Sequence, residues 1–455
     1  MTRTQCVGSP EPATWNHFGS DWRSRGARRS PGARRSPGAR RVRSTLATVG
    51  VGLFLWVTGC SEVVGPSVDP EPGPGITELP RELTAGEITA IEASNAFGFD
   101  LFRSLVVEES GNLFLSPLSA SMALGMTLNG AAGSTFDSMR STLRFGDLDE
   151  GEINASYEGL LELLTELDPH VELAVGNAVW YREGHVVRDD FRQRVERHFG
   201  ARVEGLDFAD EAAAEVINEW SRETTRGRIE EIVEPPIPAN IVAYLMNAVY
   251  FNAGWSEPFD ADLTRTEPFH RRDGSTVPVP LMMRDDTLSH FSGEGFDAVD
   301  LPYAGGAFSM TIVVPREGET NLDALIEGLD AEWWARLVEG FRTGRAQIWV
   351  PRFELEWEGV LNDALDDLGM GIAFQPSADF SRLFEGTSSW IDEVKQKSFV
   401  QVDEEGTEAA AVTSVAMTTS LPTQIRADRP FLFAIRERHS GTVLFLGALA
   451  DPAQR

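Results

Sequence analysis

Hydrophobic and polar positions divide most of the chain into segments with either helical or strand periodicity. Apolar side chains recur at helical spacing between Ile88 and Leu105, which predicts a first helix there. The run 309–315 (SMTIVVP) is almost wholly apolar and β-branched, a pattern typical of a buried strand. The same reasoning predicts strands at 177–180 and 247–251, and a helix from 217 that ends in a glycine-bearing turn near 227.

One segment fits neither an ordinary loop nor an amphipathic helix. Residues 399–402 have a strand pattern, three acidic residues follow, and Gly406 allows free backbone rotation. From Thr407 onward about a dozen residues lack Pro and Gly and carry one charge, Glu408. Counted with period two from Thr407, one face of the segment is uncharged and could be buried without desolvating an ion. The pattern therefore predicts a strand that is held out of its sheet.

This segment closely resembles the hinge of the serpins, the serine protease inhibitors. The resemblance is carried by Glu404, Glu405, Gly406, Thr407, Glu408, Ala409, Ala410 and Ala411. It implies an α+β serpin fold, with a large mixed central β-sheet, smaller sheets and about eight to nine surrounding helices. It also implies an exposed reactive-centre loop that a protease cleaves and that then inserts into the central sheet.

Other segments resemble serpin blocks and occur in the family's order between about residues 88 and 452. They include residues 112–119, 130–135, 247–251, 301–303, 351–353, 368–370, 378–381, 430–433 and 441–447. In the first of these, Ser116 suits a helix cap and Pro117 the first helical turn. Taken in series, these blocks extend the resemblance over nearly the whole body of the chain.

The resemblance also implies a sheet-opening region. It comprises Ser116, Ser119, Asn247, Trp255 and Gln396. The family usually has a histidine where this chain has Gln396, and that histidine links neighbouring strands by hydrogen bonds. Because glutamine both donates and accepts but does not titrate, we expect the link to survive without pH sensitivity at this position.

The scissile bond falls on one of two adjacent positions. Counting from Gly406 places it at Ser420–Leu421, whereas counting back from Pro430 places it at Thr419–Ser420. Small residues here favour an elastase-like or subtilisin-like serine protease, and a cysteine protease is a further candidate. Met417 would also suit a chymotrypsin-like enzyme. No Arg or Lys lies between residues 407 and 423, which disfavours trypsin-like targets.

The leading hypothesis is therefore a suicide-substrate inhibitor of serine proteases, and the alternative is a non-inhibitory serpin-fold binding or structural protein. Non-inhibitory members tend to carry a charged or bulky residue, or proline, in the hinge. Thr407, Ala409 and Ala411 on the inward face are small and uncharged. An enzyme is disfavoured because the chain has no GxSxG, HExxH or CxxC motif. We expect no cofactor and no metal.

Composition narrows the list of partners. The chain is 42% hydrophobic and 24% charged, which is ample for a globular core. Residues 1–60 hold 10 basic and 2 acidic side chains, so the remaining 30 basic and 68 acidic residues give the body a formal charge of −38. Such a surface disfavours nucleic acid and heparin as partners, and we expect a monomer.

The N-terminal region is predicted to lie outside the folded body. Residues 1–59 combine a basic low-complexity arm, in which GARRSP recurs, with a signal peptide whose apolar core is 46–57. The arm is either disordered or untranslated, with the true start near Val42. Residues 60–80 form a Pro/Gly-rich tether, and 81–455 form the serpin domain.

Cys60 ends the sequence VTGC, which resembles a bacterial lipobox. The resemblance implies cleavage before Cys60, lipid on its thiol and a membrane-anchored protein of the cell envelope. An ordinary signal peptide that happens to contain Cys60 is the alternative, and it would give a secreted protein. The only other cysteine is Cys6, so a disulfide framework in the body is excluded.

Overall fold

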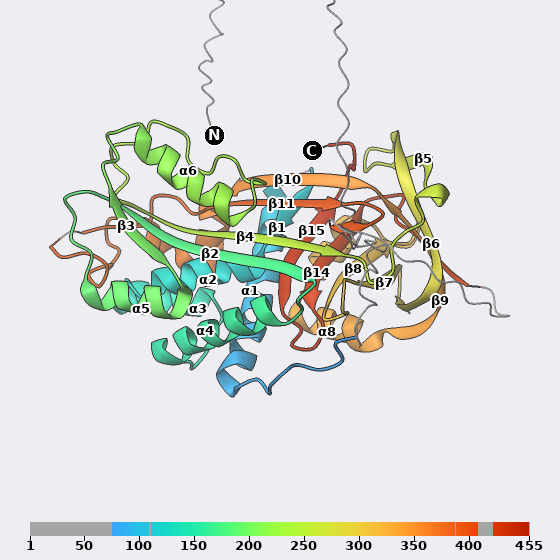
Figure 1. The fold of residues 1–455 in the computed structure, drawn as a ribbon, viewed down its shortest axis with the longest axis horizontal. Coiled ribbons are helices and arrows are strands. Elements are labelled where there is room, and N and C mark those ends of the chain that lie inside the picture. The colour runs from blue at the N-terminus through green and yellow to red at the C-terminus, as the bar shows by residue number, and fades with distance from the viewer. Residues whose placement is uncertain (1–74, 109–110, 387, 408–421, 455) are drawn as a thin grey trace, which may run out of the picture. The chain divides into compact units, whose positions relative to one another are not determined.

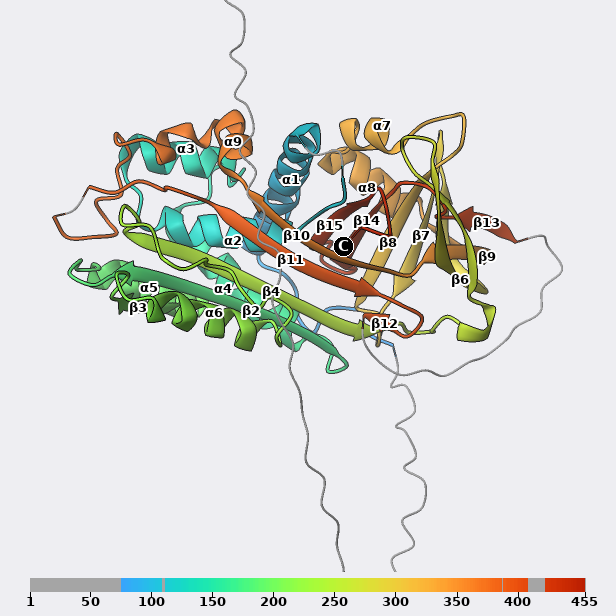
Figure 2. The ribbon, with the colours of Figure 1, turned by 90° about the horizontal axis from the view of Figure 1, so that it is seen from above.

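The computed structural model describes residues 75–108, 111–386, 388–407 and 422–454. Within these ranges the strands form three β-sheets, and nine α-helices surround them (Figures 1 and 2). No helix in these ranges has the length and apolar character needed to span a membrane.

The largest sheet has nine strands and lies on the side of the molecule that carries the C-terminal residues (Figure 2). Its order is β1 (Leu113–Leu115), β15 (Val443–Leu449), β14 (Phe431–Glu437), β8 (Phe308–Pro315), β7 (Phe296–Pro302), β6 (Thr276–Ser292), β9 (Arg342–Pro351) and β13 (Thr423–Arg426), with β5 (Arg265–His270) paired to β6. Strand β13 runs parallel to β9, and the other pairs are antiparallel.

Two smaller sheets lie next to each other. One has the order β12 (Gly406–Thr407), β4 (Ala243–Gly254), β2 (Val171–Arg182) and β3 (Arg202–Leu206), and the other pairs β10 (Phe353–Val360) with β11 (Lys395–Val402). Strands β2 and β3 are parallel, whereas β4 pairs antiparallel with both β2 and β12. Strands β4 and β11 run side by side (Figure 2).

The nine helices of the described residues lie on both faces of the β4–β2 layer and beside the large sheet. They are α1 (Ala85–Glu108), α2 (Pro117–Leu128), α3 (Gly133–Thr142), α4 (Glu150–Glu166), α5 (Asp189–Phe199), α6 (Ala212–Thr224), α7 (Leu322–Glu327), α8 (Ala331–Gly340) and α9 (Asn362–Leu365), with short turns at Ala261–Leu263, Asp366–Met370 and Gly371–Phe374. Helix α6 packs Ile217 and Trp220 on one face, against Ala178, Trp180 and Ala248. Helix α2 packs on the opposite face of β4.

The sequence predicted several of these elements correctly. The helix expected at 88–105 is α1, which is somewhat longer at both ends. Ser116 caps α2 by accepting a hydrogen bond from the Ser119 amide at 3.2 Å, and Pro117 occupies its first turn. The strands expected at 177–180, 247–251 and 309–315 belong to β2, β4 and β8, and α6 is followed by a turn in which Gly227 has a φ of +80°.

The folded body begins before the boundary expected at residue 81. The Ile76 amide donates to the Gly305 carbonyl at 2.7 Å, and the Ile76 carbonyl accepts from the His439 ring. Ile76 and Leu79 also pack against the core. The end of the predicted tether is therefore attached to the body, because its two apolar side chains are partly buried there.

A buried ion pair and the hydroxyls bound to it join three strands of the large sheet. Asp300 of β7 accepts from the Arg436 guanidinium at 3.0 Å, and both side chains are almost fully buried. The same carboxylate oxygen accepts from the Ser309 and Thr311 hydroxyls at 2.9 and 2.7 Å. Arg438 approaches the other oxygen at 3.4 Å. The charge on Asp300 is thus fully compensated inside the core.

We expect Asp300→Ala to lower the free energy of unfolding by about 3–5 kcal/mol, because it leaves Arg436 charged, buried and unpaired. Urea unfolding followed by tryptophan fluorescence measures this. The matched control is Asp323→Ala, since Asp323 is 61% exposed in its pair with Arg272 and its loss costs under about 1 kcal/mol. Equal losses in the two variants would contradict the structural role given to the Asp300 cluster.

Candidate functional site

A tight turn connects β11 to the segment predicted to be the hinge. Within it the Asp403 carboxylate accepts from the amides of Glu405 and Gly406, at 3.0 and 3.2 Å. Gly406 has a φ of +141°, and a Cβ at this position would lie 2.6 Å from the carbonyl oxygen of Ala253. Only glycine fits here, because any side chain would collide with the backbone of β4.

The turn is fixed to the end of β4 by backbone pairing. Gly406 lies opposite Gly254 and Thr407 opposite Ala253 in an antiparallel register. The Trp255 amide donates to the Glu405 carbonyl at 2.9 Å, and the Trp255 indole donates to the Asp403 carbonyl at 3.0 Å. Trp255, expected in the sheet-opening region, therefore holds the turn through both its backbone and its side chain.

Thr407 points into the core, as its position on the uncharged face predicted. Its side chain is buried, and its hydroxyl lies 3.2 Å from the Tyr303 hydroxyl. Tyr303 is itself stacked on Trp255 with ring centroids 4.4 Å apart. The first inward position of the segment thus rests on two aromatic rings.

Glu404 forms an ion pair that fastens the turn to the connection between β9 and β10. Its carboxylate accepts two hydrogen bonds from Arg352 at 2.6 Å and one at 3.0 Å, and a further one from Thr264 at 2.7 Å. The Glu404 carbonyl accepts from the Phe259 amide at 2.8 Å. Burial on its own would raise the pKa of Glu404, but the hydrogen bonds from Arg352 and Thr264 outweigh it and hold the pKa below its usual value.

Beyond the turn, the neighbouring edges of β4 and β11 are not joined to each other. In the described part of the chain, β4 pairs with β2 on one side and with the two residues of β12 on the other, and β11 pairs with β10. The two strands nonetheless run close together (Figure 2). Within the described residues no strand pairs with these facing edges, so an added strand could form hydrogen bonds with both.

Below these edges, Gln396 is bound to the start of α2. Its amide oxygen accepts from the Ser116 amide and its nitrogen donates to the Ser116 carbonyl, both at 3.1 Å. The Ser116 hydroxyl donates to the Leu444 carbonyl at 2.6 Å. Gln396 of β11 is thereby fixed to the helix cap.

Asn247 of β4 is held by different partners. Its amide oxygen accepts from the Ser119 hydroxyl, and its nitrogen donates to Asn177 at 2.7 Å. The link between β4 and β11 therefore runs through the first turn of α2, from Asn247 to Ser119 and from Gln396 to Ser116. The expectation of a direct strand-to-strand link is replaced by an indirect one, because the glutamine amide matches the paired donor and acceptor of the Ser116 backbone.

The structure adds site residues for which the sequence assigned no role. Tyr303 and Arg352 lie in the predicted blocks 301–303 and 351–353, but their partners are distant in sequence, and spacing alone does not reveal them. Other predicted site residues lie outside the described residues and receive no structural account. These are Cys60, Glu408, Ala409, Ala410, Ala411, Thr419, Ser420 and Leu421.

We expect Glu404→Gln to lower the thermal unfolding midpoint at neutral pH, because it removes the charge that Arg352 binds. Since the folded-state pKa of Glu404 is depressed, its stabilisation is present above the unfolded-state pKa of about 4.3 and is lost as pH falls through the folded value. The difference between wild type and variant should therefore close at acid pH. Melting curves from pH 3 to 7 measure it.

The exposed neighbour provides the control for this test. Glu405→Gln removes the same charge from the same turn, and Glu405 is exposed. Its effect should be small at every pH. A Glu405→Gln variant that matches Glu404→Gln across the range would contradict the anchoring role of Glu404.

Comparison with known proteins agrees with this arrangement. Residues 92–452 match the profile of the serpin family, described as serine protease inhibitors. An uncharacterised serpin-like protein of Thermococcus kodakarensis is 36% identical over 376 residues, covering 80% of this chain and 86% of the relative. Plasminogen activator inhibitor 1 of Neovison vison is 32% identical over 377 residues, covering 80% of this chain and 94% of the relative.

A solved structure shares the fold. Tengpin, a thermophilic serpin crystallised in the native state, superimposes with a TM-score of 0.74 at 28% identity, covering 83% of this chain and 96% of tengpin. The predicted fold class, α+β with a mixed central sheet and about nine helices, is confirmed. Serpins are protease inhibitors rather than enzymes. On the family match, the shared fold and the hinge geometry together, the chain belongs to the serpin family.

Proposed function

We propose that the protein inhibits serine proteases by suicide-substrate trapping, in which the cleaved reactive loop inserts between β4 and β11. One observation carries the proposal: the hinge is already paired with the end of β4, while the facing edges of β4 and β11 beyond it are unpaired in the described residues. Insertion would add hydrogen bonds between the backbone of the loop and those two edges, and each new hydrogen bond contributes on the order of 1 kcal/mol.

The register at the hinge indicates where the inserted strand would lie. Continuing the pairing of Thr407 with Ala253 places Thr413 opposite Asn247. If the pairing of Asp403 with Gly406 also continued, the inserted Thr413 would lie opposite Gln396 on β11. The two amide side chains of the sheet-opening region would therefore flank one small inward residue, which supports insertion without a steric barrier at that level.

The length of β4 also fits the proposal. The continued register reaches Met417 opposite Ala243, the first residue of β4. The two candidate scissile bonds, among Thr419, Ser420 and Leu421, lie just beyond this point. Burial of Val415 and Met417 on insertion would add roughly 1.5–3 kcal/mol each. Trapping depends on completing this movement before the acyl-enzyme is hydrolysed, so it is a kinetic competition from a metastable state.

The proposed targets are elastase-like, subtilisin-like or chymotrypsin-like serine proteases, with cysteine proteases as a further class. We also propose that the protein acts at a bacterial cell envelope, anchored by lipid on Cys60. The small residues of the loop support the first proposal and the VTGC sequence supports the second. The alternative function, a non-inhibitory binding or structural protein of the same fold, is an outcome of the test below.

We expect residues 61–455, mixed with elastase, subtilisin or chymotrypsin, to give an SDS-stable band at the summed mass with at least one of them. Thr407→Arg should be cleaved equally fast but should lose that band, because its guanidinium cannot stay buried beside Tyr303, and the hinge would then lose the pairing with the end of β4 from which insertion starts. Denaturing gels give the yield of complex, and mass spectrometry of the released peptide fixes the cut.

Glu408→Arg is the matched control, since it places the same side chain on the outward face one residue later. It should form the complex as wild type does. Clean cleavage of wild type by all three proteases, without a complex and without a rise in thermal stability, would favour the non-inhibitory alternative. A Thr407→Arg variant that still traps protease would contradict the assigned insertion face.

A further inference from the structure

A cavity of about 120 Å³ lies where β4 begins and where the chain enters β11, at the end of these strands remote from the hinge. Ala123 of α2 and Ala243 and Leu245 of β4 line two of its sides. A third side is formed by Leu383 and Phe384 of the segment that leads into β11. Its walls are mostly apolar, and its size is close to that of engineered cavities, about 150 Å³, that bind benzene.

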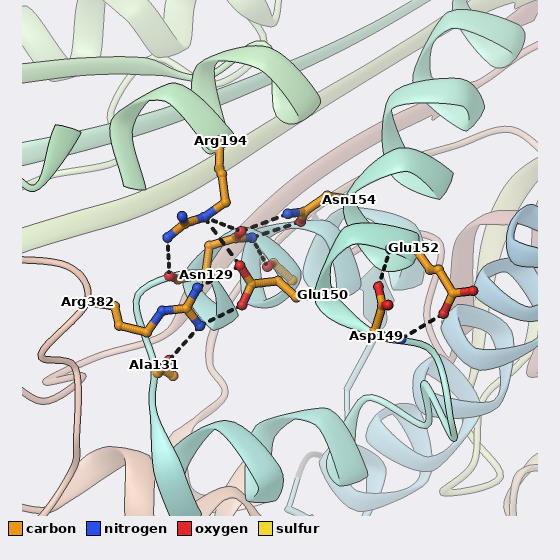
Figure 3. Close-up of polar contacts among 9 residues, drawn as sticks. Asn129, Ala131, Asp149, Glu150, Glu152, Asn154, Arg194 and Arg382 are labelled. Carbon is orange, nitrogen blue, oxygen red and sulfur yellow. Dashed lines mark hydrogen bonds and ion pairs between the residues drawn. The ribbon is translucent and has the colours of Figure 1, made fainter. Parts of the chain in front are cut away.

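The third wall is anchored to the helices by an ion-pair cluster (Figure 3). Arg382 donates to both carboxylate oxygens of Glu150, at 2.6 and 2.7 Å, and to the Ala131 carbonyl at 3.3 Å. Arg194 of α5 approaches the same carboxylate at 3.3 Å. This wall therefore belongs to the helical part of the molecule, whereas the opposite wall belongs to β4.

The polar groups at the cavity point to the chemistry of a ligand. Ser389 lines the cavity and is only 8% exposed, and its buried hydroxyl has no hydrogen-bond partner among the described residues. Asp392 and Glu393 also line it, and both residues are exposed. The Asp392 carboxylate accepts from the Asn240 side-chain amide at 2.8 Å and from the Trp390 indole at 3.2 Å. Burial, followed by the charges of Glu393 and Asp392, raises the pKa of Tyr244 to about 12.

We propose that this cavity binds a small amine with a single aromatic ring or a branched alkyl group of similar bulk. The apolar group fills the space between α2, β4 and the Leu383–Phe384 wall. The ammonium group lies at the rim, where it meets the carboxylates of Asp392 and Glu393 and donates to the Ser389 hydroxyl. A buried hydroxyl without a partner is costly, so a donor at this position offsets that cost.

The position of the cavity implies a role in trapping, and this part rests on the proposed function. If the hinge register continued on insertion, Val415 would lie opposite Leu245 and Met417 opposite Ala243, on the same inward face as Thr407. An inserted loop would cover the cavity and direct two apolar side chains toward it. A bound amine would occupy that space and so shift the outcome from trapped protease toward cleaved, released inhibitor.

Isothermal titration calorimetry of the full chain tests the site with benzylamine, benzyl alcohol and benzoate, which share one ring and differ in charge. We expect benzylamine to bind at least tenfold more tightly than benzoate, with benzyl alcohol between them. The double variant Asp392→Asn/Glu393→Gln should reduce benzylamine to the affinity of benzyl alcohol. Glu385→Gln, an exposed carboxylate on the same segment that does not line the cavity, should leave it unchanged.

A second variant tests the location independently of charge. Ala123→Leu adds bulk inside the cavity and should weaken all three compounds at least tenfold. Equal affinity for the three compounds, no binding at all, or full binding to a folded Ala123→Leu variant would each overturn the proposed site.

Repeating the titration after the loop is cut by a protease tests the coupling to insertion. We expect the cleaved chain to melt at a higher temperature and to lose benzylamine binding at least tenfold. A higher melting temperature with unchanged binding would overturn the coupling and leave the site in place. If cleavage does not raise the melting temperature, the proposed function fails, while binding to the intact chain still decides the site.

Discussion

Within the described residues, no strand pairs with the edges of β4 and β11 that face each other beyond the hinge, and the rest of the structure depends on this constraint. Backbone donors and acceptors in a partly buried sheet are normally satisfied by a neighbouring strand. Within the described residues these two strands run side by side in separate sheets, and the hinge pairs with only the last two residues of β4. The fold thus keeps an incomplete layer and holds the beginning of the missing strand at one end of it.

Three sets of contacts keep this incomplete layer in place. At the hinge, Gly406 permits close approach to β4, and Glu404 is bound by Arg352. In the middle, the cap of α2 holds Gln396 and Asn247 separately, so each strand is tied to the helix. At the far end, the ion pair of Arg382 with Glu150 fixes the segment that enters β11. Each set of contacts positions one stretch of the gap between the two strands.

Features that depend on local chemistry could be predicted from the sequence. Ser116 and Pro117 follow the rules of helix capping, and the burial of Thr407 follows from strand alternation after a glycine. The family resemblance supplied the architecture. The sequence did not reveal Ser116 as the partner of Gln396, because the position of α2 relative to β11 depends on tertiary packing.

Contacts between residues far apart in sequence could not be derived in this way. Tyr303 lies beside Thr407 and Asp300 pairs with Arg436 only because strands from separate parts of the chain come together. The cavity beneath the start of β4 has the same origin, since α2, β4 and the segment before β11 each supply one wall. Periodicity identifies each wall as apolar but does not show that space is left between them.

A crystal structure of the chain after cleavage of its loop tests the central claim most directly. The account predicts a new strand paired with both β4 and β11, with Thr407 still opposite Ala253 and Thr413 lying between Asn247 and Gln396. A cleaved chain in which β4 and β11 remain unpaired beyond Thr407, or pair with each other, would contradict it.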